Sequence, residues 1–157
     1  MKKTTKLVAF VLLSAFMVTL LTSCKKTPSD TSTFRALANE KGYILYDVTE
    51  QYVNAPQVRE ATIAAPSDRA FRIEFYIITD KDSAKELFQS QSEVMEGAKG
   101  DSWSGNVSNG ANYAKRTVVT EGKYMMLCYI ENTMLYVPMT DITNRKAIEA
   151  FIDAFKY

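Results

Sequence analysis

The two cysteines of the sequence stand in different surroundings and suggest different chemistry. Cys24 follows a run of mostly apolar residues, 7–21, and precedes two lysines. Cys128 lies inside the segment KYMMLCYI, between a leucine and a tyrosine. A thiol becomes nucleophilic when a neighbouring cation or base favours the thiolate, and the sequence places no such group beside Cys128. We therefore expect Cys128 to be a small core residue.

Histidine is absent from the sequence. Its absence excludes Ser-His-Asp and Cys-His catalysis, and also sites in which histidine holds zinc, iron or copper. Acid–base chemistry would then fall to carboxylates, lysine or tyrosine. The chain also lacks the GxGxxG and P-loop patterns of nucleotide sites. We expect no metal, no cofactor and no enzymatic activity, with a small carboxylate-based hydrolase as the alternative.

Charged residues form two groups that could do chemistry. Asp80 and Asp82 begin like a calcium-binding loop, but Lys85 stands where such a loop needs glycine and Gln91 where it needs glutamate. We expect them to cap a helix instead. The second group lies on the first three predicted strands and their turns, where we expect a solvated face with cross-strand ion pairs. Its members are Asp47, Glu50, Arg59, Glu60, Arg69, Arg72 and Glu74.

The first 23 residues have the parts of a secretory leader: a basic start, an apolar stretch and a small-residue end. Fifteen apolar residues in a helix span about 22 Å, less than the ~30 Å hydrocarbon core. Leu21-Thr22-Ser23-Cys24 resembles the lipobox of bacterial lipoproteins. The alternatives are an ordinary secretory signal with an incidental cysteine and a transmembrane anchor.

The lipobox resemblance implies cleavage before Cys24, a diacylglyceryl group on its sulfur and, in many bacteria, acylation of the new amino group. The protein would be anchored by lipid on the extracytoplasmic face of the cell membrane, or of an outer membrane if the source has two. Acyl chains contribute about 0.8 kcal/mol per buried CH₂. Lys25 and Lys26 would then lie at the lipid headgroups.

Removal of residues 1–23 leaves 134 residues, which suffice for one domain. The three lysines of the leader leave with it, so 16 basic residues face 18 acidic ones and the net charge is near −2. This charge argues against nucleic-acid binding. We divide the chain into a signal peptide (1–23), a lipidated cysteine with a polar tether (24–32) and a single α+β domain (33–157).

Periodicity and turn residues predict the elements of the domain. The segment 70–78 alternates cleanly, with Phe71, Ile73 and Phe75 on one face and Arg72, Glu74 and Tyr76 on the other. Helices are expected at 34–41, 80–99 and 142–155, strands at 43–49, 58–65, 70–78, 112–120, 123–130 and 133–137, and a flexible loop at 101–110.

This order, α-βββα-βββα, predicts an α+β fold with one antiparallel sheet of about six strands and helices packed on it. In element order it resembles the PsbP/Mog1-like α/β/α sandwich family, and a cystatin-like or NTF2-like cone is the competing shape. The segments GYILYDVTEQY, IEFYIITD and ENTMLYVP are similar to those of uncharacterised small bacterial lipoproteins. Neither resemblance assigns functional residues.

Trp103, the single tryptophan, falls in the predicted loop, where an exposed ring could contact a ligand or partner. The alternative is a ring that plugs the sheet edge. We expect a membrane-anchored binding or accessory module with an unknown protein or small-molecule partner, and a structural subunit of an envelope assembly is the alternative. A pocket lined by tyrosine and one or two charges would favour a small ligand, and a flat apolar patch would favour a protein.

Replacement of the predicted lipidated cysteine tests this assignment. Cys24→Ser removes the acceptor sulfur, so the variant should leave the membrane fraction and the detergent-rich phase. Cys128→Ser is the matched control and should remain in both. Continued membrane retention of Cys24→Ser would contradict the lipoprotein assignment.

Overall fold

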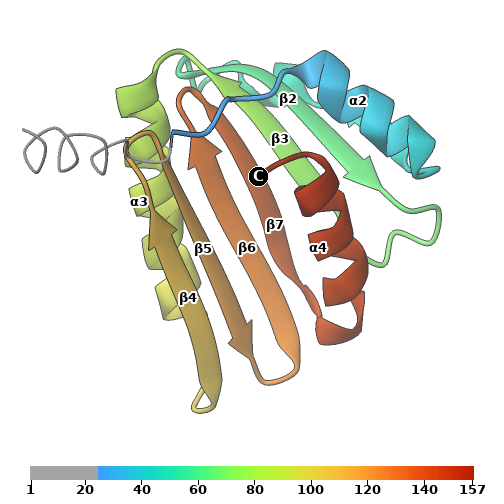
Figure 1. The fold of residues 1–157 in the computed structure, drawn as a ribbon, viewed down its shortest axis with the longest axis vertical. Coiled ribbons are helices and arrows are strands. Elements are labelled where there is room, and N and C mark those ends of the chain that lie inside the picture. Colours follow the sequence, from blue (N-terminus) through green and yellow to red (C-terminus); the bar gives the residue numbers. More distant parts are fainter. Residues whose placement is uncertain (1–24) are drawn as a thin grey trace, which may run out of the picture.

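The computed structural model describes residues 25–157, and the predicted signal peptide with Cys24 lies outside them (Figure 1). Between residues 25 and 157, no helix is long and apolar enough to cross a bilayer. The elements in chain order are α2 (Thr31–Glu40), β1 (Ile44–Asp47), η1 (Thr49–Tyr52), β2 (Val58–Ala65), β3 (Ile73–Ile78), α3 (Lys81–Gly97), β4 (Trp103–Asn109), β5 (Tyr113–Thr120), β6 (Lys123–Ile130), β7 (Thr133–Asp141), η2 (Ile142–Asn144) and α4 (Arg145–Ala154).

The strands form one antiparallel sheet in the order β1-β2-β3-β7-β6-β5-β4. This confirms the α+β class and the single antiparallel sheet. The sheet has seven strands, however, and the element order is α-βββα-ββββα. The last strand of the first group, β3, pairs with the last strand of the second, β7, and so joins the two halves of the chain in the middle of the sheet.

The additional strand is β4, which occupies the segment predicted as a flexible loop. It pairs with β5 from Trp103 opposite Thr120 to Asn109 opposite Ala114. All seven of its residues are exposed, because it lies at the edge of the sheet and no helix covers either face. A strand without a buried face needs no apolar alternation, which explains why its Ser/Gly/Asn-rich sequence resembled a loop.

Helices α2 and α4 cover one face of the sheet (Figure 1). Phe34 of α2 is fully buried in this layer. Its ring stacks on Phe75 of β3 with centroids 5.2 Å apart. It also meets Phe151 and Phe155 edge to face, each at 5.5 Å. The helix begins at Thr31, earlier than the predicted residue 34, because Asp30 caps it by accepting the backbone N–H of Thr33 at 2.7 Å.

Helix α3 lies alone on the other face, where its apolar side packs against β6, β7 and β3. Asp80 caps the helix, as predicted, by accepting the backbone N–H of Ser83 at 2.8 Å. This bond holds the pKa of the Asp80 carboxyl below its usual value. The buried residues of this layer are Val48, Ala61, Tyr76, Ile78, Ala84, Phe88, Met95, Ala114, Val118, Met125, Leu127, Tyr129 and Met134.

Truncation of the central ring of the α2 layer tests the packing. Phe34→Ala should lower the free energy of unfolding by about 3–5 kcal/mol, because it leaves a cavity among three aromatic rings. Val94→Ala is the control, since Val94 is 60% exposed on α3 and should change stability little. Urea denaturation followed by circular dichroism measures both, and a Phe34→Ala loss no larger than that of Val94→Ala would contradict the packing.

Candidate functional site

Cys128 and Trp103 were considered individually as possible functional residues, and they lie in very different surroundings. Cys128 is fully buried in the core between the sheet and helices α2 and α4. Burial raises the pKa of its thiol to about 11, so the thiolate is disfavoured at neutral pH. Cys128 is therefore a core residue with no access to a ligand, as the sequence predicted.

Trp103 opens β4 at the edge of the sheet, and 52% of its surface is exposed. The Lys99 ammonium lies 3.2 Å from the centroid of its ring, in a cation–π contact. Next to this contact, the Glu96 carboxylate forms ion pairs with both Lys99 and Arg116. Trp103 thus stands on an edge strand rather than in a loop, and it lines neither of the two pockets described below.

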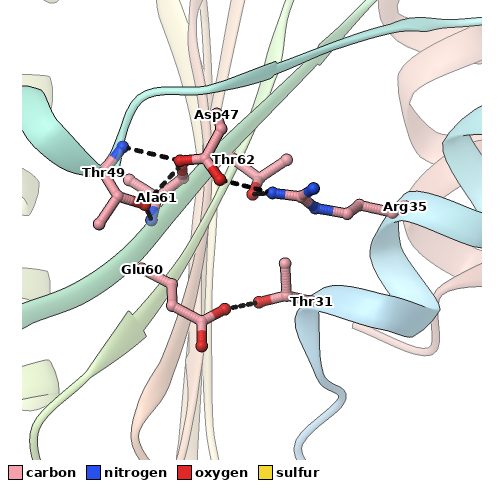
Figure 2. Close-up of polar contacts among 7 residues, drawn as sticks. All are labelled: Thr31, Arg35, Asp47, Thr49, Glu60, Ala61 and Thr62. Carbon is pink, nitrogen blue, oxygen red and sulfur yellow. Dashed lines mark hydrogen bonds and ion pairs between the residues drawn. The ribbon is translucent and has the colours of Figure 1, made fainter.

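The exposed carboxylates of β1 and β2 bind α2 to the sheet (Figure 2). Asp47 accepts from the Arg35 guanidinium at 2.8 Å and from the backbone N–H of Thr49 at 3.1 Å. The Thr49 bond is the main reason that the pKa of Asp47 is lowered. Glu60 accepts from the Thr31 hydroxyl at 2.6 Å. Both carboxylates are exposed, as predicted, but their partners lie on α2 and not on a neighbouring strand, so neither forms the expected cross-strand ion pair.

Glu74 departs from that prediction, because it is only 5% exposed. Its carboxylate accepts from the Arg72 guanidinium at 2.5 Å and from the Tyr76 hydroxyl. Tyr76 in turn shares a hydrogen bond of 2.9 Å with the Tyr52 hydroxyl. A buried carboxylate is tolerated when charged and hydroxyl donors replace its water, and Glu74 has both. The sequence did not predict the burial of Glu74, because this face of β3 is covered only when the strands and α3 pack together.

Glu74 belongs to a row of directly opposed residues that crosses four strands. Tyr46 of β1 faces Ile63 of β2, Ile63 faces Glu74 of β3, and Glu74 faces Tyr136 of β7. Directly opposed residues of an antiparallel sheet lie on the same face. The next residue of the row, Leu127 of β6, is buried in the α3 layer. The row therefore runs from beneath α3 onto the part of that face beyond the helix.

A tyrosine pocket of about 260 Å³ lies where this row meets α3. The Gln91 side chain of α3 donates to the Tyr136 hydroxyl at 3.0 Å across the pocket. Burial, followed by the charge of Glu74, raises the pKa of Tyr76 well above its usual value. The phenol therefore stays protonated and acts as a donor. The pocket is lined by Tyr52, Val58, Glu74, Tyr76, Leu87, Ser90, Gln91, Met134 and Tyr136.

An arginine pocket of about 610 Å³ lies further along the row, where no helix covers the sheet. Arg69 and Arg72 reach it from the turn between β2 and β3, and Tyr46 and Ile63 form part of its floor. The Arg69 guanidinium lies 5.9 Å from the centroid of the Tyr46 ring. The pocket is lined by Tyr46, Ile63, Ala65, Arg69, Ala70, Phe71, Arg72, Pro138, Met139 and Thr140.

Arg69 adopts a left-handed backbone conformation, with φ of 53°. Its N–H donates to the Pro66 carbonyl at 2.9 Å, which closes the turn. This conformation costs a non-glycine residue roughly 1–2 kcal/mol, and it is usually adopted by glycine or asparagine. The fold would accept glycine at position 69 with less backbone strain. The arginine found there places a guanidinium group at the pocket.

The two guanidinium groups give the arginine pocket the character of an anion-binding site. Arg72 is oriented by the buried Glu74, and among the described residues the Arg69 side chain makes no ion pair or hydrogen bond, so both guanidinium groups have donors available to a ligand. Guanidinium forks match carboxylate and phosphate groups. Glu74 is the one carboxylate that lines either pocket. Within residues 25–157, no group of three or more acidic or cysteine side chains could hold a metal ion.

Comparison with known proteins leaves the family open. No protein-family model and no curated protein matches the chain. A crystal structure of a GTP binding regulator from Thermotoga maritima aligns with 81% of this chain and 84% of its own, at 12% identity and a TM-score of 0.48. A likeness of that strength carries no argument about function.

Removal of one hydroxyl tests the network around the buried carboxylate. Tyr76→Phe should lower the free energy of unfolding by about 1.5–3 kcal/mol, because the Glu74 carboxylate loses a donor. The raised pKa of Tyr76 stabilises the native state fully below about pH 10 and less above it. The gap between wild type and variant should therefore shrink in alkaline urea titrations.

Tyr46→Phe is the matched control for this measurement. Its hydroxyl makes no hydrogen bond among the described residues, so the substitution should leave stability almost unchanged. Equal effects of the two substitutions at neutral pH would show that the Glu74 network does not stabilise the fold.

Proposed function

We propose that the protein is a lipid-anchored, extracytoplasmic, non-enzymatic binding module whose ligand is a small organic anion. The lipid anchor rests on the resemblance of residues 21–24 to a lipobox. The binding role rests on the arginine pocket, where two guanidinium groups stand over an apolar and aromatic floor. That combination suits a ligand with a carboxylate or phosphate at one end and an apolar body.

The arrangement of Glu74 supports binding rather than hydrolysis. Carboxylate-based hydrolysis needs two carboxyl groups close together in a cleft, one as acid and one as base or nucleophile. Glu74 has no second carboxylate beside it in the lining of either pocket. It accepts from Arg72 and Tyr76, so its role is to hold the Arg72 guanidinium in place. We therefore assign Glu74 as a positioning residue.

The exposed edge strand favours a second candidate function, as an assembly subunit. β4 has one unpaired edge, and Trp103 and Val107 are half exposed on it. An edge of this kind can accept a strand from another chain by β-augmentation. The two candidates use opposite edges of the sheet, so they can be separated experimentally.

Substitution of the arginine in the left-handed turn tests the proposed site. Arg69→Gly removes one guanidinium and suits the φ of 53°, so the fold should be at least as stable while binding falls. The probe is anilinonaphthalenesulfonate, which carries an anionic group on an apolar ring system. We expect the wild-type protein to bind it with enhanced fluorescence and the variant to bind it at least about tenfold more weakly, a loss of ~1.4 kcal/mol.

Lys156→Gly is the matched control, since Lys156 also has a positive φ, of 66°, and carries the same charge outside the pocket. It should leave probe affinity unchanged. Equal affinities of both variants and wild type would overturn the proposed site. The wavelength of the Trp103 emission maximum separates the two candidate functions: a ligand in the arginine pocket should leave this wavelength unchanged, and a partner on β4 should shift it.

A further inference from the structure

The segment next to the predicted lipid anchor is bound directly to the domain. The backbone N–H of Lys26 donates to the Asn112 side-chain oxygen at 3.0 Å. The Asn112 amide returns a bond to the Lys26 carbonyl at 2.7 Å. One asparagine side chain therefore satisfies both backbone groups of Lys26, as a neighbouring strand would. The Lys26 ammonium also lies 5.0 Å from the centroid of the Tyr113 ring.

Asn112 is a rigid partner for this contact. It is only 3% exposed, and its amide also donates to the Glu131 carboxylate at 2.7 Å. Its backbone carbonyl accepts the N–H of Glu131 at 2.8 Å, which joins it to the turn between β6 and β7. A buried amide with its oxygen and nitrogen both engaged resists displacement, because breaking these bonds leaves buried polar groups without partners.

Covalent geometry limits how far the anchor can lie from this point. Cys24 is two residues before Lys26, and two residues span at most about 7 Å. A lipid on Cys24 would therefore hold the Asn112 end of the sheet close to the headgroups. This end comprises Lys26 with residues 79–81, 110–112 and 131–132, which are joined by hydrogen bonds from Ile78 to Asn132 and from Lys81 to Ala111.

The charges at this end suit a lipid surface. Lys25 is exposed, Lys26 follows it, and the Lys81 ammonium donates to the Ala111 carbonyl at 3.3 Å. Acidic groups are present as well, but Asp80 is engaged in capping α3 and Glu131 accepts from Asn112. Asp82 is the exposed acid of the first turn of α3.

The arginine pocket lies at the other end of the sheet. Arg69 and Arg72 precede the start of β3, whereas the Asn112 end adjoins its last residue, Ile78. Six residues of strand separate the two ends by about 20 Å. An anchor fixed at Asn112 therefore directs the pocket away from the bilayer.

We propose that the Asn112–Lys26 contact is an orientation latch, which holds the Asn112 end of the domain against the lipid surface and presents the arginine pocket outward. This inference rests on the proposed lipid anchor and deepens it. A free tether would let the domain rotate, whereas a tether fixed two residues from the lipid does not. The partner that this surface fits is the bilayer itself.

Two insertions of the same flexible Gly/Ser segment test the latch in the full lipidated chain. One lies between Cys24 and Lys25, before the latch, and the other lies between Thr27 and Pro28, after it. A segment of about twelve residues spans roughly 20 Å on average. Neither insertion alters a residue of the folded domain, so both variants should fold.

The readout is quenching of a thiol-attached fluorophore by lipids with a nitroxide headgroup, in vesicles of phosphatidylethanolamine and phosphatidylglycerol. Asp82→Cys places the label near the Asn112 end and Ser67→Cys places it in the turn beside the arginine pocket; buried Cys128 does not compete for the label. In the parent chain, the label at position 82 should be quenched several-fold more than that at position 67.

Insertion before the latch should abolish this difference, and insertion after it should preserve it. Equal quenching of the two labels in the parent chain, or equal effects of the two insertions, would overturn the latch. Mass spectrometry of the parent chain separates this failure from that of the lipid anchor: an unlipidated Cys24 refutes the anchor and the latch together, whereas a lipidated chain without preferred orientation refutes the latch alone.

Discussion

The width of the sheet is the constraint on which the remaining features depend. Seven strands about 4.8 Å apart make a sheet roughly 29 Å wide, and a helix covers only about 10 Å of it. Two helices share one face, but α3 stands alone on the other and packs over β6, β7 and β3. Over β1 and β2 that face carries only the short 3-10 helix η1, and the arginine pocket lies on the part that neither α3 nor η1 lines.

The border between the covered and uncovered parts explains the unusual burial of one carboxylate. Glu74 lies on β3 at the edge of α3, where it is almost fully buried and side-chain donors replace most of its hydration. Tyr76 supplies one donor from the covered side, and Arg72 supplies another from the open side. The buried charge thus links the core to the pocket, and it holds a guanidinium at a surface where a ligand can reach it.

The sequence predicted those elements whose pattern is local. Alternation in 70–78 assigned Arg72, Glu74 and Tyr76 to one face, and the cap at Asp80 predicted the start of α3. The strand β4 was missed because backbone pairing holds it, without a buried face. The burial of Glu74 and the Lys26–Asn112 contact could not be predicted, since one depends on Tyr136 and the other joins residues 86 positions apart.

Anion binding in the arginine pocket is tested most directly by nuclear magnetic resonance of the arginine Nε–H groups during titration with anilinonaphthalenesulfonate. Arg69 and Arg72 line the pocket, whereas Arg59 is exposed on β2 outside its lining. Saturable shifts of the Arg69 and Arg72 signals, with an unchanged Arg59 signal, are the predicted result. Shifts confined to the Trp103 indole and the β4 amides would contradict binding in the arginine pocket and place recognition at the opposite edge of the sheet.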